Sequence, residues 1–99
     1  MTNKMKVFAI ELRERYEQAC AEADMTDREY DELNFQVDSL PEWQYTMESD
    51  HWDAVLDKAY DRMVNARKLV HSYERALNHA SKLYSALQDI EEYEEEMRG

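Results

Sequence analysis

The sequence is poor in the residues that build tight turns, cross-links and phosphate-binding loops. Its 99 residues include one glycine, one proline and one cysteine. Because strand-rich folds need many turn residues, this scarcity favours helices joined by few loops. The lone cysteine, Cys20, excludes a disulfide within the chain and fits a reducing cytoplasm. The only glycine is Gly99, which excludes a glycine-rich loop that cradles phosphates.

Long apolar runs are also missing. No segment approaches the roughly 20 apolar residues of a membrane span, and the run Val7–Ile10 is too short for a signal peptide. The formal net charge of −11 opposes direct binding to nucleic acid or to anionic lipid, and it favours basic partners. We therefore expect a single acidic domain over residues 1–99, without membrane contact, in the cytoplasm (the host cytoplasm if the chain is phage-encoded).

The clearest pattern is a helical stripe of apolar residues between Trp52 and Leu87, which we call the inner stripe. Its members follow one another in alternating steps of four and three over five heptads. They are Trp52, Leu56, Ala59, Met63, Ala66, Val70, Tyr73, Leu77, Ala80, Tyr84 and Leu87. The stripe predicts one long helix over about 50–97, which at 1.5 Å per residue would extend roughly 70 Å. Such a helix is either continuous or broken near Asn65 or Asn78.

The N-terminal part predicts two shorter helices. Apolar periodicity indicates a helix over about 3–23, and Asp24 to Thr26 reads as a connection. Thr26 and Glu29 have the spacing of a capping box, which would start a second helix over about 27–39. Residues 41–49 would then be the longest connection. A β-hairpin around Pro41 is the alternative, because apolar residues alternate at several positions within 33–47.

The heptad pattern indicates how many neighbours the long helix has. With Leu56 at position a, the g positions are mostly apolar: Val55, Arg62, Leu69, Ala76, Leu83 and Ile90. A two-stranded coiled coil prefers charges there, whereas a wider stripe is typical of a bundle helix. We therefore predict an all-α, three-helix arrangement in which the long helix packs against the two shorter ones, with dimerisation covering the rest. The packing or dimer contacts would be Trp52, Leu56, Met63, Val70, Tyr73, Leu77, Tyr84 and Leu87.

The acidic residues are concentrated in two blocks. Residues 26–50 carry a net charge of −7 and residues 76–99 a net charge of −4. The candidate partner-binding residues are Asp27, Glu29, Asp31, Glu32, Asp38 and Trp43 in the first block, and Asp89, Glu91, Glu92, Tyr93, Glu94, Glu95 and Glu96 in the second. A frayed, solvated tail is the alternative for the second block, because glutamates at a helix C-terminus oppose the helix dipole. Carboxylates beside exposed aromatic rings form a face suited to a basic protein.

In size, charge and helicity the chain resembles small acidic helical inhibitors encoded by phages and mobile elements. Those inhibitors imitate rows of DNA phosphates and act against restriction, recombination and CRISPR machinery. The resemblance implies a non-enzymatic DNA mimic, of anti-CRISPR or anti-restriction type, that occludes a basic, nucleic-acid-binding surface on a partner. A structural or scaffolding coiled-coil protein, whose role is assembly, is the alternative.

Residues for catalysis or metal binding give weaker patterns. Asp53, Asp57 and Asp61 share a helix face, and Glu11 and Glu14 form a similar pair, as in helical Mg²⁺-dependent nucleotide hydrolases. Metal sites need ligands that converge from separate helices, so this enzyme is a remote alternative.

The remaining polar residues have ordinary structural explanations. His51, His71 and His79 lack the spacing of a zinc site. The basic cluster Arg62, Arg67, Lys68 and Arg75 is expected to pair with the acidic blocks. We therefore expect no catalytic residue, no cofactor and no metal.

Overall fold

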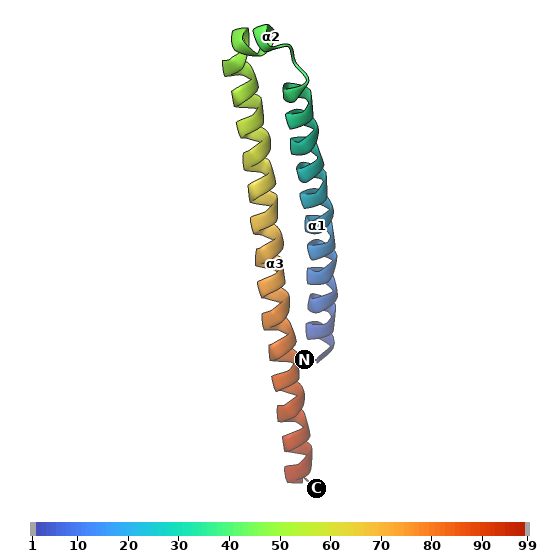
Figure 1. Cartoon of the computed structure of the whole chain (residues 1–99). Coiled ribbons are helices and arrows are strands. Elements are labelled where there is room, and N and C mark those ends of the chain that lie inside the picture. Colours follow the sequence, from blue (N-terminus) through green and yellow to red (C-terminus); the bar gives the residue numbers. More distant parts are fainter. Residues whose placement is uncertain (1, 99) are drawn as a thin grey trace. The chain divides into compact units, whose positions relative to one another are not determined.

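The described part of the chain, residues 2–98, forms three helices (Figure 1). The computed structural model describes residues 2–98, apart from the side chains of Thr2, Asn3 and Met5. Helix α1 is Thr2–Asp38, α2 is Glu42–Met47 and α3 is Ser49–Arg98. The predicted all-α arrangement, with one long C-terminal helix packed against shorter N-terminal ones, is confirmed. The hairpin alternative is wrong, because the described part of 33–47 contains no strand.

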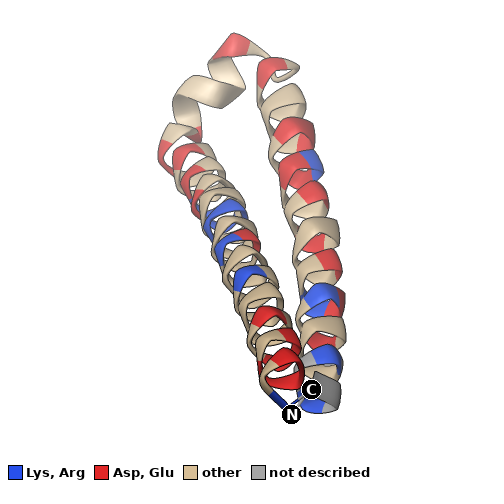
Figure 2. Cartoon of the chain, turned by 90° about the horizontal axis from the view of Figure 1, so that it is seen from below, with Lys and Arg blue, Asp and Glu red and all other residues tan. Residues whose placement is uncertain are grey.

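The chain divides into two compact units, each of which combines a segment of α1 with a segment of α3. Unit 1 comprises Met1–Glu17 and His71–Gly99, and unit 2 comprises Gln18–Val70. Within each unit the two segments lie side by side (Figures 1 and 2). The prediction of a single domain stays a prediction.

Helix α1 corrects the predicted boundary between two N-terminal helices. We expected a connection at Asp24 to Thr26, but the helix runs through it without interruption. The Thr26 hydroxyl does not cap a new helix; it donates to the Ala23 carbonyl oxygen at 2.9 Å. Ala23 and Thr26 are each only 8% exposed. Burial of these two small side chains stabilises the continuous helix, and the hydroxyl is satisfied by a bond within it.

The segment predicted as a loop after Pro41 contains the short helix α2. At the end of α1, the Ser39 hydroxyl donates to the Phe35 carbonyl oxygen at 2.8 Å. Pro41 follows with φ −58° and ψ 143°, an extended conformation, and its carbonyl oxygen accepts from the amides of Gln44 and Tyr45. A proline suits this position because its fixed φ and missing N–H cost nothing before a first helical turn.

Glu48 joins α2 to α3. Its amide donates to the Gln44 carbonyl oxygen at 3.0 Å, and its own carbonyl oxygen accepts from the Trp52 amide at 3.1 Å. The Trp52 indole N–H also donates to the Glu48 carboxylate at 3.0 Å. One residue therefore ends one helix and begins the next.

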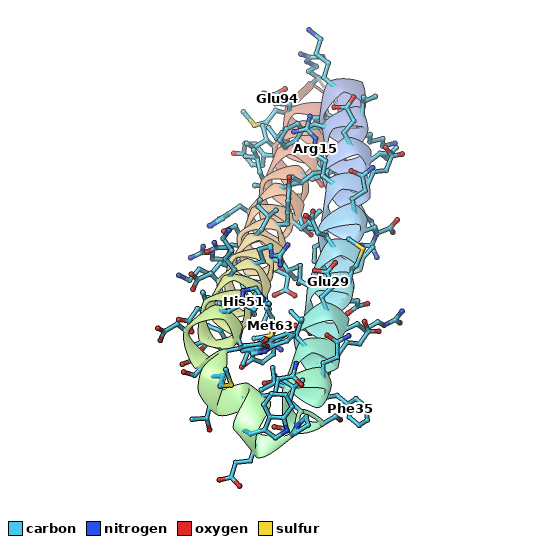
Figure 3. All side chains as sticks on the ribbon, turned by 90° about the horizontal axis from the view of Figure 1, so that it is seen from above. Arg15, Glu29, Phe35, His51, Met63 and Glu94 are labelled. Carbon is cyan, nitrogen blue, oxygen red and sulfur yellow. The ribbon has the colours of Figure 1, made fainter. Side chains whose placement is uncertain are left out.

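Helix α3 is continuous, so it breaks at neither Asn65 nor Asn78. Every member of the inner stripe is buried or half-buried, and Ala59 and Met63 are the most buried, at 1% and 7% exposed. In unit 2 this side of α3 faces α1, as the position of Met63 in Figure 3 shows. The buried apolar residues of α1 are Ala19 and Ala23, so the described core is built mainly from small side chains.

Three of the predicted g positions of α3 carry exposed apolar side chains, whereas Val55 and Ala76 are half-buried. Leu69 in unit 2 is 46% exposed, and Leu83 and Ile90 in unit 1 are each 52% exposed. We expected a bundle in which α3 packs against two shorter helices. Because α1 is one helix, each unit instead pairs α3 with a single long neighbour, which leaves these positions uncovered.

Candidate interaction surfaces

A row of aspartates runs along one flank of α1 in unit 2. Asp24, Asp31 and Asp38 lie seven residues apart, so they share a direction from the helix axis, and Asp27 lies between the first two. Asp24, Asp31 and Asp38 are exposed, and Asp27 is half-buried. We call these four residues the aspartate row. Asn34 occupies the next position in the same 3–4 spacing, and its amide donates to the Tyr30 carbonyl oxygen at 3.2 Å.

The aspartate row contains an internal ion pair. Arg67 of α3 places Nη2 3.1 Å from Oδ1 of Asp27, and the two side chains are 55% and 36% exposed. The predicted pairing of the basic cluster with the first acidic block is therefore present at this point. Arg62 of α3 instead borders the opposite flank of α1. Arg75 in unit 1 donates to the Ser72 hydroxyl at 3.3 Å.

Glu29 and Glu32 lie on that other flank of α1. A shallow hollow of about 340 Å³ is lined there by Glu29, Glu32, Leu33, Gln36 and Arg62. The acidic residues of α1 that the sequence groups in one block therefore lie on two different surfaces of the helix. Of the predicted residues of α1, Asp27, Asp31 and Asp38 lie together, and Glu29 and Glu32 lie apart from them. Sequence reasoning missed Asp24, although the 3–4 spacing would have included it had the helix not been ended there.

Large apolar side chains are exposed near the α1–α2 connection. Phe35 is 73% exposed, Trp43 66% and Met47 79%. Phe35 points outward from α1 (Figure 3). Exposed aromatic side chains are frequent anchors of protein interfaces. Of these three side chains, only Trp43 was among the predicted partner-binding residues.

The second acidic block forms the C-terminal part of α3 in unit 1 (Figure 2). All its predicted residues, Asp89, Glu91, Glu92, Tyr93, Glu94, Glu95 and Glu96, are exposed. Within the described chain none of these carboxylates forms an ion pair. The segment is helical to Arg98, the only basic residue of the last turn. Tyr93 is 64% exposed, so an aromatic ring does accompany these carboxylates at the surface.

The predicted packing residues lie on the covered side of α3 in both units. In unit 2 they are Trp52, Leu56, Met63 and Val70, and in unit 1 they are Tyr73, Leu77, Tyr84 and Leu87; none is exposed. In unit 2 the rings of Tyr30 and Tyr60 also meet across the helices, with centroids 5.7 Å apart. In unit 1 the Tyr16 hydroxyl donates to the Glu74 carboxylate at 3.3 Å.

The polar residues considered for metal binding have local partners or stay dispersed. Among residues 2–98, no group of three or more His, Cys, Asp or Glu side chains is arranged to hold a metal ion. The Tyr45 hydroxyl donates to Asp53 Oδ1 at 3.1 Å, and this bond, with the charge of Asp53, raises the pKa of Tyr45 above its ordinary value of 10.0. His71 Nδ1 lies 3.4 Å from the Glu74 carboxylate, and the His51 ring meets Trp52 edge to face.

Comparison with known proteins adds no family to this description. No family model, curated protein or solved structure matches the chain. In the described part of the chain, no helix has an apolar stretch long enough to cross a membrane.

Proposed function

We propose that the chain is a non-enzymatic, acidic protein-interaction module that inhibits a partner by occluding its basic, nucleic-acid-binding surface. The most specific form of this proposal is a DNA mimic of phage type, directed against a restriction or CRISPR nuclease.

The aspartate row carries this proposal. Its members follow one another at helical steps of three, four and seven residues, so neighbouring carboxylates are separated by roughly 5–10 Å along the axis. A DNA strand places one phosphate about every 3.4 Å of its axis. A rigid helix therefore presents negative charges along a line with a spacing of the same order as that of phosphates. A basic groove that tracks a phosphate backbone can place arginines or lysines along such a line.

The Arg67–Asp27 pair supports the proposal, because it shows a guanidinium bound to the row at 3.1 Å. The net charge of −11 adds long-range attraction for a basic partner and speeds its encounter. Phe35, Trp43 and Met47 in the same unit supply exposed apolar anchors, which give an interface the affinity that surface charges alone do not provide.

The test is a competition experiment that compares the chain with variants in which aspartates are replaced by asparagine. Proteins captured by the chain from nuclease-treated lysate are eluted with duplex DNA, at low and at high salt. Under the proposal, DNA releases the partner, and binding weakens steeply with salt. The variant Asp24→Asn/Asp31→Asn/Asp38→Asn should lose the partner. The control variant Asp50→Asn/Asp57→Asn/Asp61→Asn removes the same charge from exposed positions of α3 in unit 2. This control should still capture most of the partner.

A scaffolding function is the second candidate, favoured by the uncovered g positions of α3. If Leu69→Gln abolishes self-association while the aspartate variants leave all binding intact, assembly is the better account. Recovery of nothing but copies of the chain from lysate would also count against inhibition.

A further inference from the structure

A second apolar row lies on α3 in unit 1, beside the inner stripe. Its members follow helical steps of three and four: Leu83, Ala86, Ile90, Tyr93 and Met97. All five are exposed; Ile90 is 52%, Tyr93 64% and Met97 73% exposed. We call this set the outer row. It has the spacing of a coiled-coil seam, yet nothing in the described chain covers it.

Carboxylates flank the outer row on both sides. With Leu83, Ile90 and Met97 at position a, and Ala86 and Tyr93 at d, Asp89 and Glu96 fall at g and Glu94 falls at e; the other flanking positions hold Lys82 at g and Leu87 at e. All three carboxylates are exposed, and Glu94 projects into solvent in Figure 3. In a coiled coil, side chains at e and g face those of the partner helix, so these charges select what can bind.

The flanking charge, three carboxylates against the one cation of Lys82, disfavours some occupants of the outer row. In a parallel pair with a second copy, Asp89 at g would face Glu94 at e of the other copy, and like charges across such a seam are destabilising, whereas an antiparallel pair would also bring Lys82 near Glu96. An anionic lipid surface would be repelled for the same reason. A helix with apolar a and d positions and lysine or arginine at e and g would pair with every flanking carboxylate while covering the outer row.

We propose that the outer row is a docking site for a basic amphipathic helix of another protein. This inference rests on the proposed function in that both require a basic partner, and it adds the shape of the partner segment and a second place where it binds. The helix would lie along residues 83–97, with its apolar residues on Leu83, Ile90 and Tyr93 and its cations beside Asp89, Glu94 and Glu96. Such helix-on-helix recognition uses anchors at i, i+3 and i+7.

The probe is a synthetic helix of about three heptads with leucine at a and d and lysine at e and g. A second peptide has glutamate at e and g. Titration of the labelled peptides with the full chain, followed by fluorescence anisotropy, should show salt-sensitive binding of the lysine peptide only. Equal binding of both peptides would overturn the proposal, because the contact would then be apolar and unselective.

Matched variants locate the contact. Ile90→Gln/Tyr93→Gln should weaken binding of the lysine peptide by about tenfold or more, because two anchors lose their apolar contact. Ile10→Gln/Met25→Gln removes two exposed apolar side chains from α1 and should leave binding unchanged. All four positions are exposed, so circular dichroism should report the same helicity for both variants.

Two triple variants that remove the same charge distinguish the carboxylates that border the outer row from the overall negative charge of the chain. Asp89→Asn/Glu94→Gln/Glu96→Gln should weaken binding several-fold and flatten its salt dependence. Glu91→Gln/Glu92→Gln/Glu95→Gln removes the same charge from positions that do not border the outer row and should have a smaller effect. Equal losses in the two triple variants would contradict the proposal. So would self-association of the unbound chain that Ile90→Gln abolishes, because the occupant would then be a second copy.

These outcomes are independent of the aspartate row. Failure of the peptide arms with retained, DNA-competed capture through Asp24, Asp31 and Asp38 would remove the outer row and leave the proposed function. Loss of that capture with intact peptide binding would remove the proposed role of the aspartate row and leave the docking site on the outer row.

Discussion

Nη2 of Arg67 lies 3.1 Å from Oδ1 of Asp27, so the aspartate row of α1 already holds one cation from its own chain. The pair joins α3 to α1 in unit 2, yet both side chains keep contact with water. Its contribution to stability is therefore small, at about 1 kcal/mol or less. Its larger consequence concerns binding, since it occupies a carboxylate that a basic partner would otherwise use.

Removal of this internal cation should strengthen binding. Arg67→Gln releases Asp27, and we expect an arginine-rich synthetic peptide to bind the variant a few-fold more tightly than the parent chain, as measured by anisotropy at low salt. Lys58→Gln is the control, because it changes the net charge equally at an exposed position of α3 in the same unit. Equal tightening in both variants would show that net charge alone matters.

The continuity of α1 through Thr26 predicts a large effect of proline. Thr26→Pro should destabilise the chain by about 3 kcal/mol or more, because it removes a helical hydrogen bond and clashes with the preceding turn. Glu42→Pro at the first position of α2 should cost much less, because Pro41 already has the extended conformation that a following proline requires. Urea unfolding measures both. Similar midpoints for the two variants would indicate a connection at Thr26.

The close approach of the helices around Ala59 predicts intolerance of larger residues. Ala59 is 1% exposed, so Ala59→Leu should destabilise the chain by roughly 1–3 kcal/mol through overpacking. Ala54→Leu adds the same atoms at an exposed position of α3 and should change the free energy of unfolding by less than about 0.5 kcal/mol. A neutral Ala59→Leu variant would mean that the helices of unit 2 do not meet there.

Tyr45, near the α2–α3 junction, should titrate at a higher pH than an ordinary tyrosine. Its hydrogen bond to Asp53 and the charge of that carboxylate raise the pKa of Tyr45 above 10.0. A raised folded-state pKa means that this contribution to stability is present below pH 10 and is lost as pH rises through the folded-state pKa. Ultraviolet titration of phenolate should therefore show a late component that both Tyr45→Phe and Asp53→Asn remove. An unchanged late component in Asp53→Asn would assign it to another tyrosine.

The sequence predicted the long helix well because one physical signal dominates it. The inner stripe repeats over five heptads without proline or glycine, and every member lies on the covered side of α3. Neither Asn65 nor Asn78 interrupts the helix, because a single polar residue costs a helix only tenths of a kcal/mol. Periodicity that extends over so many turns outweighs such local preferences.

The N-terminal half was harder to predict because its local signals have two meanings. A threonine three residues before a glutamate caps a helix when the chain enters it there, but the same hydroxyl can bond back within a continuous helix. Burial of Ala23 and Thr26 decides between them, and burial depends on where α3 lies. For the same reason the sequence could list Asp27, Glu29 and Asp31 as acidic but could not assign them to two flanks. That division required α1 to be one helix, whose periodicity then orders Asp24, Asp31 and Asp38.

The small residues that line the helix contact have a calorimetric consequence. Among the described residues the buried apolar set is Ala19, Ala23, Ala59 and Met63, and no large side chain is completely removed from solvent. Since the heat capacity of unfolding scales with the apolar area exposed, its value per residue should fall below the usual range of about 12–15 cal/mol/K. The curve of unfolding free energy against temperature should then have a weaker curvature than is usual for a chain of this length.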